Sequence, residues 1–414
     1  MANSGEKKNV GLLKSVEERA LSKKVEDEQK RQNVPYFHKD CISNILIRLP
    51  LESLQSSRFV CKPWYNIINS PIFIDAHLRR SESVLIFLES VQNERYPYLE
   101  RSMPTQKPNY FSVESSFLQS KPVPIFGQPV NTLPKFRIQF LEFKEGKSKV
   151  TEYKVSCLGL IRATCNGLIL LDNKLKKGGL LVMNPVTRKL MALPLGTIYP
   201  PQNESYGFAL SNTTGEYKVV HLFRDELGYV SCEILNIGTR FWREVNGPSF
   251  GLFGWFGYEP VSAIGALHWV PQVDHNDYIV SMEVDNEKFH TIRLPENCRT
   301  YDRIIEMAGL LCLVVHEELN IDIWNLKSIG EGVWTKQYSI TRGSVLDMVP
   351  MFSLRISGDI IFKRAEDGSF YAYDFRFQEM RKVEIDKKCF PFSGTYLPHV
   401  NSLVSWMPSQ NVCD

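Results

Sequence analysis

The sequence has no long apolar run and no concentration of cysteine. The start, MANSGEKKNVGLLKS, lacks the apolar run of a signal peptide. No later stretch holds the roughly 18 uninterrupted apolar residues that a membrane span requires. The nine cysteines are odd in number and scattered, without a C-x-x-C pair, which argues against a zinc site or a disulfide framework. We therefore expect a soluble protein of the cytoplasm, the nucleus or both, with no metal, no cofactor and no membrane partner.

Charge of one sign is also scarce, and so are catalytic motifs. The formal net charge is +3, too small for a dedicated phosphate-binding surface, so a nucleic-acid partner is not expected. The sequence contains no G-x-S-x-G, G-x-G-x-x-G or G-x-x-x-x-G-K-[ST] pattern, and the stretch HEELN at His316 has Asn320 where H-E-x-x-H needs its second histidine. No catalytic residue is predicted.

Three segments have the composition of irregular structure. Residues 1–33 combine eight basic and six acidic residues with few large apolar ones, and predict a disordered or solvated tail. Residues 91–134 contain seven prolines, and we interpret them as an irregular insertion, disordered or functional. Residues 408–414 form a short C-terminal tail.

Between these segments, the sequence pattern of residues 34–79 predicts helix. Ile42, Ile45, Leu46 and Leu49 recur at the spacing of one helical face. Prolines at positions 50 and 63 predict breaks, which gives three short helices over residues 37–78. A core of about 40 residues is marginal without disulfide, metal or partner, so we expect another protein to cover part of its apolar surface.

Residues 80–407 read as short antiparallel strands with an internal repeat. A glycine that opens an apolar strand recurs at steps of 48, 50, 44 and 49 residues, at Gly167, Gly215, Gly265, Gly309 and Gly358. This period, near that of kelch repeats, predicts a β-propeller. We expect six blades, with seven as the alternative. Strands at 84–89, 137–143 and 151–156, joined by the final strand at 402–406, would form the blade that closes the ring.

Two connections between repeats are rich in aromatic residues. The stretch PSFGLFGWFGYEP and the stretch IYPPQNESY occupy equivalent positions before a new repeat. Their rings either fill gaps between blades or act as binding anchors, since aromatic residues are frequent hot spots of interfaces. The predicted target-binding residues are Phe250, Phe253, Trp255, Phe256, Tyr258 and Tyr199.

The motifs resemble two known families. ILIRLP, LESL, VCKPW and NIINSPIF, in residues 37–78, are similar to the F-box. CNGLILL, NPVTRKLMALP, YGFALSNTTGEYKVV, GALHWV and GLLCLV follow in the order found in the F-box-associated, kelch-like domain of plant F-box proteins. Where the F-box usually begins with Leu-Pro, this chain has Phe37 and His38.

The resemblance implies the substrate receptor of an SCF-type ubiquitin ligase. The F-box would bind a Skp-family adaptor, and through it the cullin and RING subunits, while the β domain would present an unknown target protein for ubiquitination and proteasomal degradation. A scaffold acting outside the ligase, or a propeller enzyme or small-ligand binder, are the alternatives. The residues implied for adaptor binding are Phe37, Ile42, Ile45, Leu46, Leu49, Pro50, Leu54, Val60 and Trp64.

Overall fold

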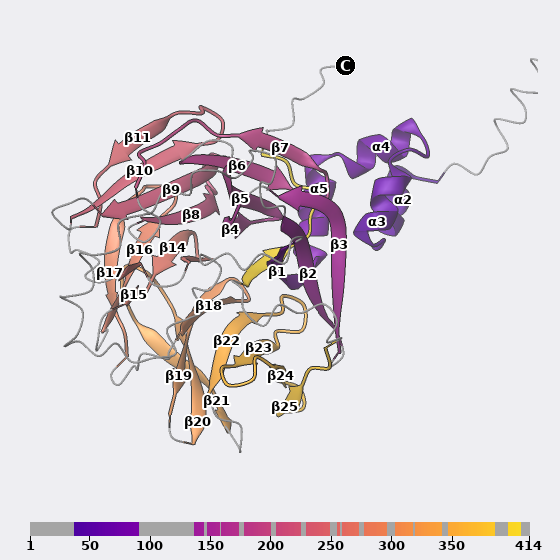
Figure 1. The fold of residues 1–414 in the computed structure, drawn as a ribbon. Coiled ribbons are helices and arrows are strands. Elements are labelled where there is room, and N and C mark those ends of the chain that lie inside the picture. Colours follow the sequence, from indigo (N-terminus) through magenta and orange to yellow (C-terminus); the bar gives the residue numbers. More distant parts are fainter. Residues whose placement is uncertain are drawn as a thin grey trace, which may run out of the picture. The chain divides into compact units, whose positions relative to one another are not determined.

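The chain forms two compact units, Met1–Asn69 and Ser70–Asp414, drawn in the computed structural model of Figure 1. The predicted tails 1–33 and 408–414 and the insertion 91–134 lie outside the residues that the structure describes. The described residues are 37–90, 136–144, 147–157, 159–173, 178–199, 204–224, 229–248, 255–256, 259–272, 277–295, 303–317, 319–341, 347–385 and 396–406.

The first unit, here called the helical unit, contains α2 (Lys39–Leu46), α3 (Leu51–Ser57) and α4 (Lys62–Ile68). Pro50 is the N-cap residue of α3, and Pro63 lies in the first turn of α4, where a missing N–H costs no hydrogen bond. The expected third helix is divided at Asn69 and Ser70, because Ser70 starts a new helix by accepting a hydrogen bond from the Phe73 N–H at 3.3 Å. The region therefore holds four helices, the fourth being α5 (Pro71–Arg80).

The second unit is a β-propeller of six four-stranded antiparallel sheets, which confirms the predicted blade number. The first strands of neighbouring blades contact one another around the axis. A further two-stranded sheet pairs β12 (Trp255–Phe256) with β15 (Pro271–Gln272).

The blades follow one another along the chain from the second onwards. Blade 1 consists of β26 (Leu397–Val400), β1 (Ser83–Ser90), β2 (Phe136–Lys144) and β3 (Lys147–Cys157); blade 2 of β4 (Ile161–Cys165), β5 (Leu168–Asn173), β6 (Gly179–Asn184) and β7 (Lys189–Ala192); blade 3 of β8 (Glu204–Leu210), β9 (Tyr217–Arg224), β10 (Val230–Asn236) and β11 (Trp242–Val245); blade 4 of β13 (Val261–Ala263), β14 (Ala266–Trp269), β16 (Tyr278–Glu283) and β17 (Phe289–Arg293); blade 5 of β18 (Arg303–Met307), β19 (Leu310–His316), β20 (Asn320–Leu326) and β21 (Trp334–Thr341); and blade 6 of β22 (Met348–Ser353), β23 (Ile360–Arg364), β24 (Phe370–Asp374) and β25 (Glu379–Lys382).

Both ends of the propeller sequence meet in blade 1. The strand β26 pairs with β1 in antiparallel register, with Val84 opposite His399, so closure leaves no long open edge. The predicted closing strand, 402–406, is misplaced by about one strand length, because residues 401–406 continue as irregular backbone. They are mostly buried, and Asn184 of blade 2 donates hydrogen bonds to the carbonyl oxygens of Ser402 and Val404.

The repeated glycines have a common conformational reason. All five adopt positive φ, between 68° at Gly215 and 90° at Gly167, a region that side chains other than glycine rarely occupy. Three of them form the second residue of a two-residue turn whose first residue also has positive φ, the type I′ geometry that matches the twist of a hairpin. The glycine period in the sequence is therefore the period of the first hairpin in blades 2 to 6.

The helix α5 packs as part of the propeller unit, although the sequence groups it with the preceding helices. Ile74 and Leu78 join a core cluster with Val404 and Trp406. The Glu82 carboxylate, after α5, accepts a hydrogen bond from the Arg355 N–H at 2.5 Å. Within the propeller unit, these contacts fix α5 to the segment after β26 and to the β22–β23 turn.

Candidate docking and target-binding surfaces

The helical unit has a small interior. Leu46, Leu54 and Ile68 are fully buried, and Leu51 and Ile67 are nearly so. At roughly 1.5–3 kcal/mol for each fully buried aliphatic side chain, five such residues contribute on the order of 10 kcal/mol. Ordering each backbone residue costs about 1–2 kcal/mol, so this interior alone gives little net stability.

Several apolar side chains of the helical unit face solvent instead. Phe59 is 88% exposed and Val60 62%, because α3 ends at Ser57 and both residues lie in the turn that follows it. Phe37, Ile45 and Tyr65 are also more than half exposed. We call Phe37, Ile45, Phe59, Val60 and Tyr65 the exposed apolar set.

The structure places the nine residues implied for adaptor binding in three environments. Phe37, Ile45, Pro50 and Val60 are exposed; Ile42, Leu49 and Trp64 are half-buried; Leu46 and Leu54 are buried in the interior. Sequence reasoning missed Phe59 and Tyr65 as exposed residues, since the prolines at positions 50 and 63 predict one helix over the residues between them. The early end of α3 is what exposes Phe59.

In the propeller unit, the connections from the outer strand of one blade to the inner strand of the next carry the predicted target-binding residues. Tyr199 lies in the β7–β8 connection, half-buried, with its ring stacked on Phe223 at 4.8 Å between centroids. Trp255 and Phe256 form β12, in the β11–β13 connection. Because strands alternate in direction within a blade, connections of this kind lie on one face of the propeller. Phe250, Phe253 and Tyr258 lie outside the described residues.

The Tyr199 connection is tied to blade 3 by a buried carboxylate. Glu233 accepts hydrogen bonds from the Thr197 N–H at 2.9 Å and from the Thr197 hydroxyl at 3.0 Å. The indole of Trp242 also donates to the Pro194 carbonyl at 3.0 Å. These bonds attach Pro194 and Thr197, shortly before Tyr199, to blade 3.

Glu233 belongs to a chain of charged groups between blades 2 and 3. Arg162 pairs with Asp172 at 2.6 Å and with Glu204 at 3.2 Å. His221, 1% exposed, lies 3.3 Å from a Glu204 oxygen and 2.8 Å from a Glu233 oxygen. Each buried charge is thus placed beside an opposite one, as a low-dielectric interior requires.

The pKa values of this chain follow from its geometry. Burial lowers the pKa of His221, but hydrogen bonds and charges from Glu204 and Glu233 outweigh that effect and hold the pKa above its ordinary value. Burial acts in the opposite sense on Glu233, and the bonds from His221 and Thr197 hold the pKa of that carboxyl below its ordinary value. The two carboxylates therefore favour the protonated form of His221.

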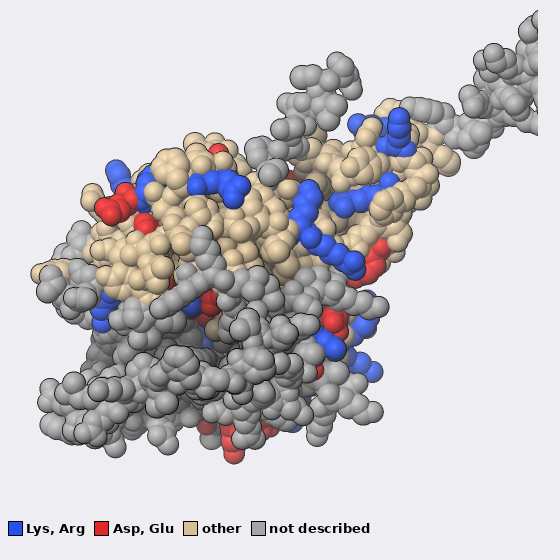
Figure 2. Space-filling model, turned by 45° about the horizontal axis from the view of Figure 1, so that its top comes forward, with Lys and Arg blue, Asp and Glu red and all other residues tan. Residues whose placement is uncertain are grey.

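Elsewhere the described surface is only moderately charged. On the face shown in Figure 2, Lys and Arg side chains lie in separate groups with uncharged residues between them. Within the described ranges, no three His, Cys, Asp or Glu residues are grouped closely enough to hold a metal ion. No helix in the described part of the chain is both long and apolar enough to cross a membrane.

Comparison with known proteins agrees with this architecture. A family model described as the F-box domain matches residues 38–75, and one described as the F-box associated beta propeller domain matches residues 130–393. The F-box protein CPR1 of Arabidopsis thaliana is 25% identical, over 73% of this chain and 72% of that protein. The F-box protein At3g07870 of the same plant is 26% identical over the same shares.

Among solved structures the similarity is low. The crystal structure of TolB from Acinetobacter baumannii superposes on 84% of this chain and 72% of its own, with a TM-score of 0.42 and 12% identity. The propeller family model alone covers more than half of this chain. The chain belongs to the family of F-box proteins with an F-box-associated β-propeller domain.

Proposed function

We propose that this protein is the substrate-recognition subunit of an SCF-type ubiquitin ligase. Its helical unit binds a Skp-family adaptor, and its propeller binds a target protein for ubiquitination and proteasomal degradation. The protein forms no covalent intermediate in this role. It accelerates ubiquitin transfer by holding the target near the loaded enzyme, which raises the effective concentration of the two reacting groups.

The observation that carries the proposal is the exposed apolar set of the helical unit. An interior of five residues is at the lower limit of independent stability, whereas Phe59 and Val60 leave large apolar surfaces in water. Five large apolar side chains left in water on so small a unit favour a protein partner that covers them. We assign the seam with the adaptor to this set and to Pro50, with Leu46 and Leu54 acting as the interior that shapes it.

The test is co-purification of the full chain with a Skp-family adaptor. Ile45→Glu and Val60→Glu change exposed side chains, so they should leave folding intact and lower adaptor affinity at least about tenfold, as expected for residues near the centre of an interface. Phe241→Glu is the matched control, since Phe241 is 58% exposed in the propeller unit. Full adaptor affinity in both helical-unit variants would refute the docking assignment.

A second measurement separates the ligase receptor from the scaffold alternative. The complex of chain and adaptor is mixed with cullin and RING subunits, and ubiquitin transfer to proteins captured by the propeller is followed in a reconstituted reaction. A receptor supports transfer that Val60→Glu lowers in parallel with adaptor affinity. A scaffold binds the adaptor but gives no transfer above the reaction that lacks the chain.

A further inference from the structure

The Tyr199 connection approaches blade 3 so closely that a buried carboxylate bonds to its backbone. Glu233 accepts the Thr197 N–H on one carboxylate oxygen and the Thr197 hydroxyl on the other. At Gly196, an added Cβ would lie 2.4 Å from Glu233 Oε1 and 2.9 Å from Trp242 Cε2. The missing side chain of this glycine therefore lets the backbone reach the carboxylate.

Glu233 depends on His221 for a positive partner. The Glu233 side chain is 6% exposed, and its Oε1 lies 2.8 Å from His221 Nδ1. Among the residues that the structure describes, His221 is the only cationic group within ion-pair distance of this carboxylate. A buried carboxylate without a neighbouring cation is costly, because burial removes the water that would stabilise its charge. The charge that holds Thr197 is therefore tied to the charge on His221.

The second carboxylate beside the imidazole has a cation of its own. Glu204 lies 3.3 Å from His221 Nε2 and also 3.2 Å from an Arg162 nitrogen. Arg162 in turn pairs with Asp172 at 2.6 Å. Loss of a proton from His221 thus leaves Glu204 beside a cation and Glu233 beside none.

The other side chains around the imidazole carry no charge near neutral pH. The Tyr206 ring stacks on it with 4.3 Å between centroids and donates its hydroxyl to Glu204 at 3.2 Å. Burial raises the pKa of this phenol, so it stays neutral. Phe223 and Trp242 add rings that do not titrate, at 4.9 and 6.1 Å between centroids. His221 is therefore the member of this group whose charge changes nearest to neutral pH.

We propose that the protonation state of His221 controls whether the Tyr199 connection is attached to blade 3. With the imidazole protonated, Glu233 keeps its charge inside the protein and holds Thr197. With the imidazole neutral, Glu233 turns toward water to keep its charge and releases Thr197. Ile198, which is 50% exposed, and Tyr199 lie on this connection, so release changes the surface that they present. The switch is a property of the chain alone and does not depend on the proposed function.

The switch has a defined direction with pH. His221 has a raised pKa, so the attachment is present below its ordinary value of 6.5 and is lost as pH rises through the folded-state pKa. Glu233 has a lowered pKa, so it remains charged as pH falls to its ordinary value of 4.5. The connection is therefore attached between these two ordinary values and released at alkaline pH.

Hydrogen–deuterium exchange of the full chain from pH 6 to 9 tests the switch without any variant. At each pH, the exchange rate of the peptide 193–199 is divided by the rate of the same peptide free in solution, which removes the intrinsic effect of pH. Coupling between two sites typically changes an equilibrium about 5- to 150-fold, so we expect this ratio to rise about tenfold. Peptides from β9 and β10 should keep their protection, because the blade itself stays folded.

Four variants separate control by charge from loss of a contact. Glu233→Gln keeps an acceptor for Thr197 but carries no charge, so the peptide should stay protected over the whole range. Gly196→Ala adds the clashing Cβ and should give fast exchange at every pH. His221→Gln removes the cation and should exchange at pH 6 as the wild type does at pH 9. Glu244→Gln, at an exposed position of β11, should follow the wild-type profile.

Three results would overturn the proposal. The first is a wild-type ratio that does not change with pH. The second is the same pH profile in Glu233→Gln, since the titrating pair would then lie elsewhere. The third is a parallel loss of protection in β9 and β10, which would show that the whole blade opens. The wild-type and Glu233→Gln profiles decide these outcomes even where His221→Gln fails to fold, and adaptor co-purification tests the proposed function separately.

Discussion

Asn184, fully buried at the end of β6, donates a hydrogen bond from its side-chain amide to the carbonyl oxygen of Val404 at 2.8 Å. The same nitrogen donates to Ser402, and the amide oxygen accepts from the N–H groups of Val186 and Thr187. One side chain thus binds the segment after the closing strand and the β6–β7 turn together. Closure of the ring depends on this amide as well as on the β26–β1 pairing.

Replacing Asn184 should therefore weaken the whole propeller. Asn184→Leu removes four hydrogen bonds from a buried site, and a buried polar group that loses its partner costs about 1–3 kcal/mol. We expect a loss of at least about 3 kcal/mol in the free energy of unfolding, measured by urea denaturation. Asn212→Ala, on an exposed turn, should change it by less than about 0.5 kcal/mol. A small effect at Asn184 would mean that the strand pairing alone closes the ring.

The substitution of glycine by alanine should lower the free energy of unfolding by different amounts at two of the repeated glycines. Gly167 and Gly309 both have positive φ in equivalent turns. A Cβ on Gly167 would lie 2.1 Å from the Ser402 hydroxyl oxygen, whereas nothing lies within 4 Å of a Cβ on Gly309. Gly309→Ala should cost about 1–2 kcal/mol from the backbone alone.

Gly167→Ala adds a clash at the ring closure and should cost at least about 2 kcal/mol more than Gly309→Ala. Thermal unfolding of the two variants side by side gives the comparison, and the difference in melting temperature should be several degrees. Equal melting temperatures would show that the segment containing Ser402 moves aside freely.

These glycines also show why the sequence predicts this fold well. Positive φ in a hairpin turn favours glycine, so glycine recurs in the sequence once per hairpin, from Gly167 to Gly358. The closing strand is harder to predict, because Leu397–Val400 and 402–406 are similarly apolar. The structure pairs Leu397–Val400 with β1 and bonds residues 402 and 404 to Asn184, more than 200 residues away.

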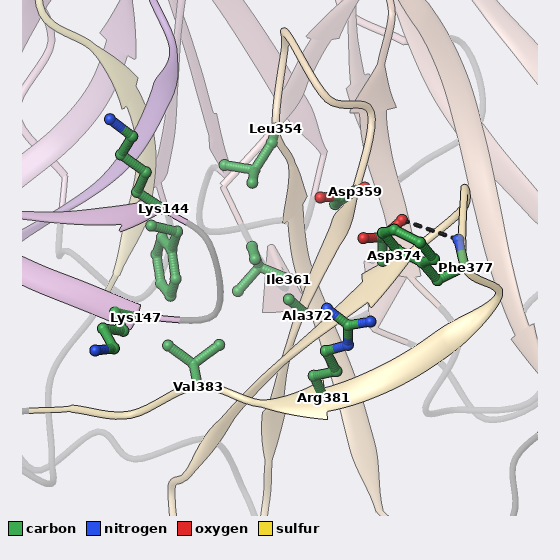
Figure 3. Close-up of a pocket in the computed structure, with 11 residues that line it drawn as sticks. Lys144, Lys147, Leu354, Asp359, Ile361, Ala372, Asp374, Phe377, Arg381 and Val383 are labelled. Atoms are coloured by element: carbon green, nitrogen blue, oxygen red, sulfur yellow. Dashed lines mark hydrogen bonds between the residues drawn. The ribbon is translucent and has the colours of Figure 1, made fainter.

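The candidate surfaces are predicted less completely for a related reason. The prolines at positions 50 and 63 predict one helix between them, but the exposure of Phe59 depends on where α3 ends, and Ser57 and Arg58 carry no strong stop signal. A cavity of about 240 Å³ between blades 1 and 6, shown in Figure 3, has no sequence signature. Its floor residues Phe143, Leu354 and Val383 come from separate strands and turns, so only the closed ring brings them together.

The charged groups around His221, between blades 2 and 3, predict a pH-dependent contribution to stability. His221 has a raised pKa, so its contribution is fully present below its ordinary value of 6.5 and is lost as pH rises through the folded-state pKa. Glu233 has a lowered pKa, so its contribution is present above its ordinary value of 4.5 and is lost as pH falls through the folded-state pKa. Both contributions are present together between these two ordinary values.

Glu233→Gln keeps an acceptor oxygen for Thr197 and removes the charge facing His221. The difference in unfolding free energy between wild type and variant should be largest at about pH 5–6 and decrease on both sides. Urea denaturation from pH 4 to 9 measures it. Glu244→Gln, at an exposed position of β11, should give a profile parallel to the wild type. A pH-independent difference for Glu233→Gln would show that the pair acts only as neutral hydrogen bonds.

The attachment of α5 to the propeller gives a local prediction. Glu82 accepts hydrogen bonds from the N–H groups of Ser83, Arg355 and Ile356, and the Arg355 guanidinium donates to the Leu78 carbonyl at 3.4 Å. Glu82→Ala removes the acceptor, and a hydrogen bond to a charged group contributes about 1.5–3 kcal/mol. Exposure to solvent reduces this figure, so we expect amide exchange in residues 74–80 to accelerate about five- to tenfold.

Hydrogen–deuterium exchange on the full chain measures this opening directly. Glu82→Gln retains an oxygen for the Arg355 and Ile356 N–H groups, so it should exchange more slowly than Glu82→Ala and faster than the wild type. This order follows because the acceptor and the charge are lost in separate steps. If both variants exchange like the wild type while blade 2 stays protected, the apolar packing of Ile74 and Leu78 alone holds α5, and Glu82 only orders the β22–β23 turn.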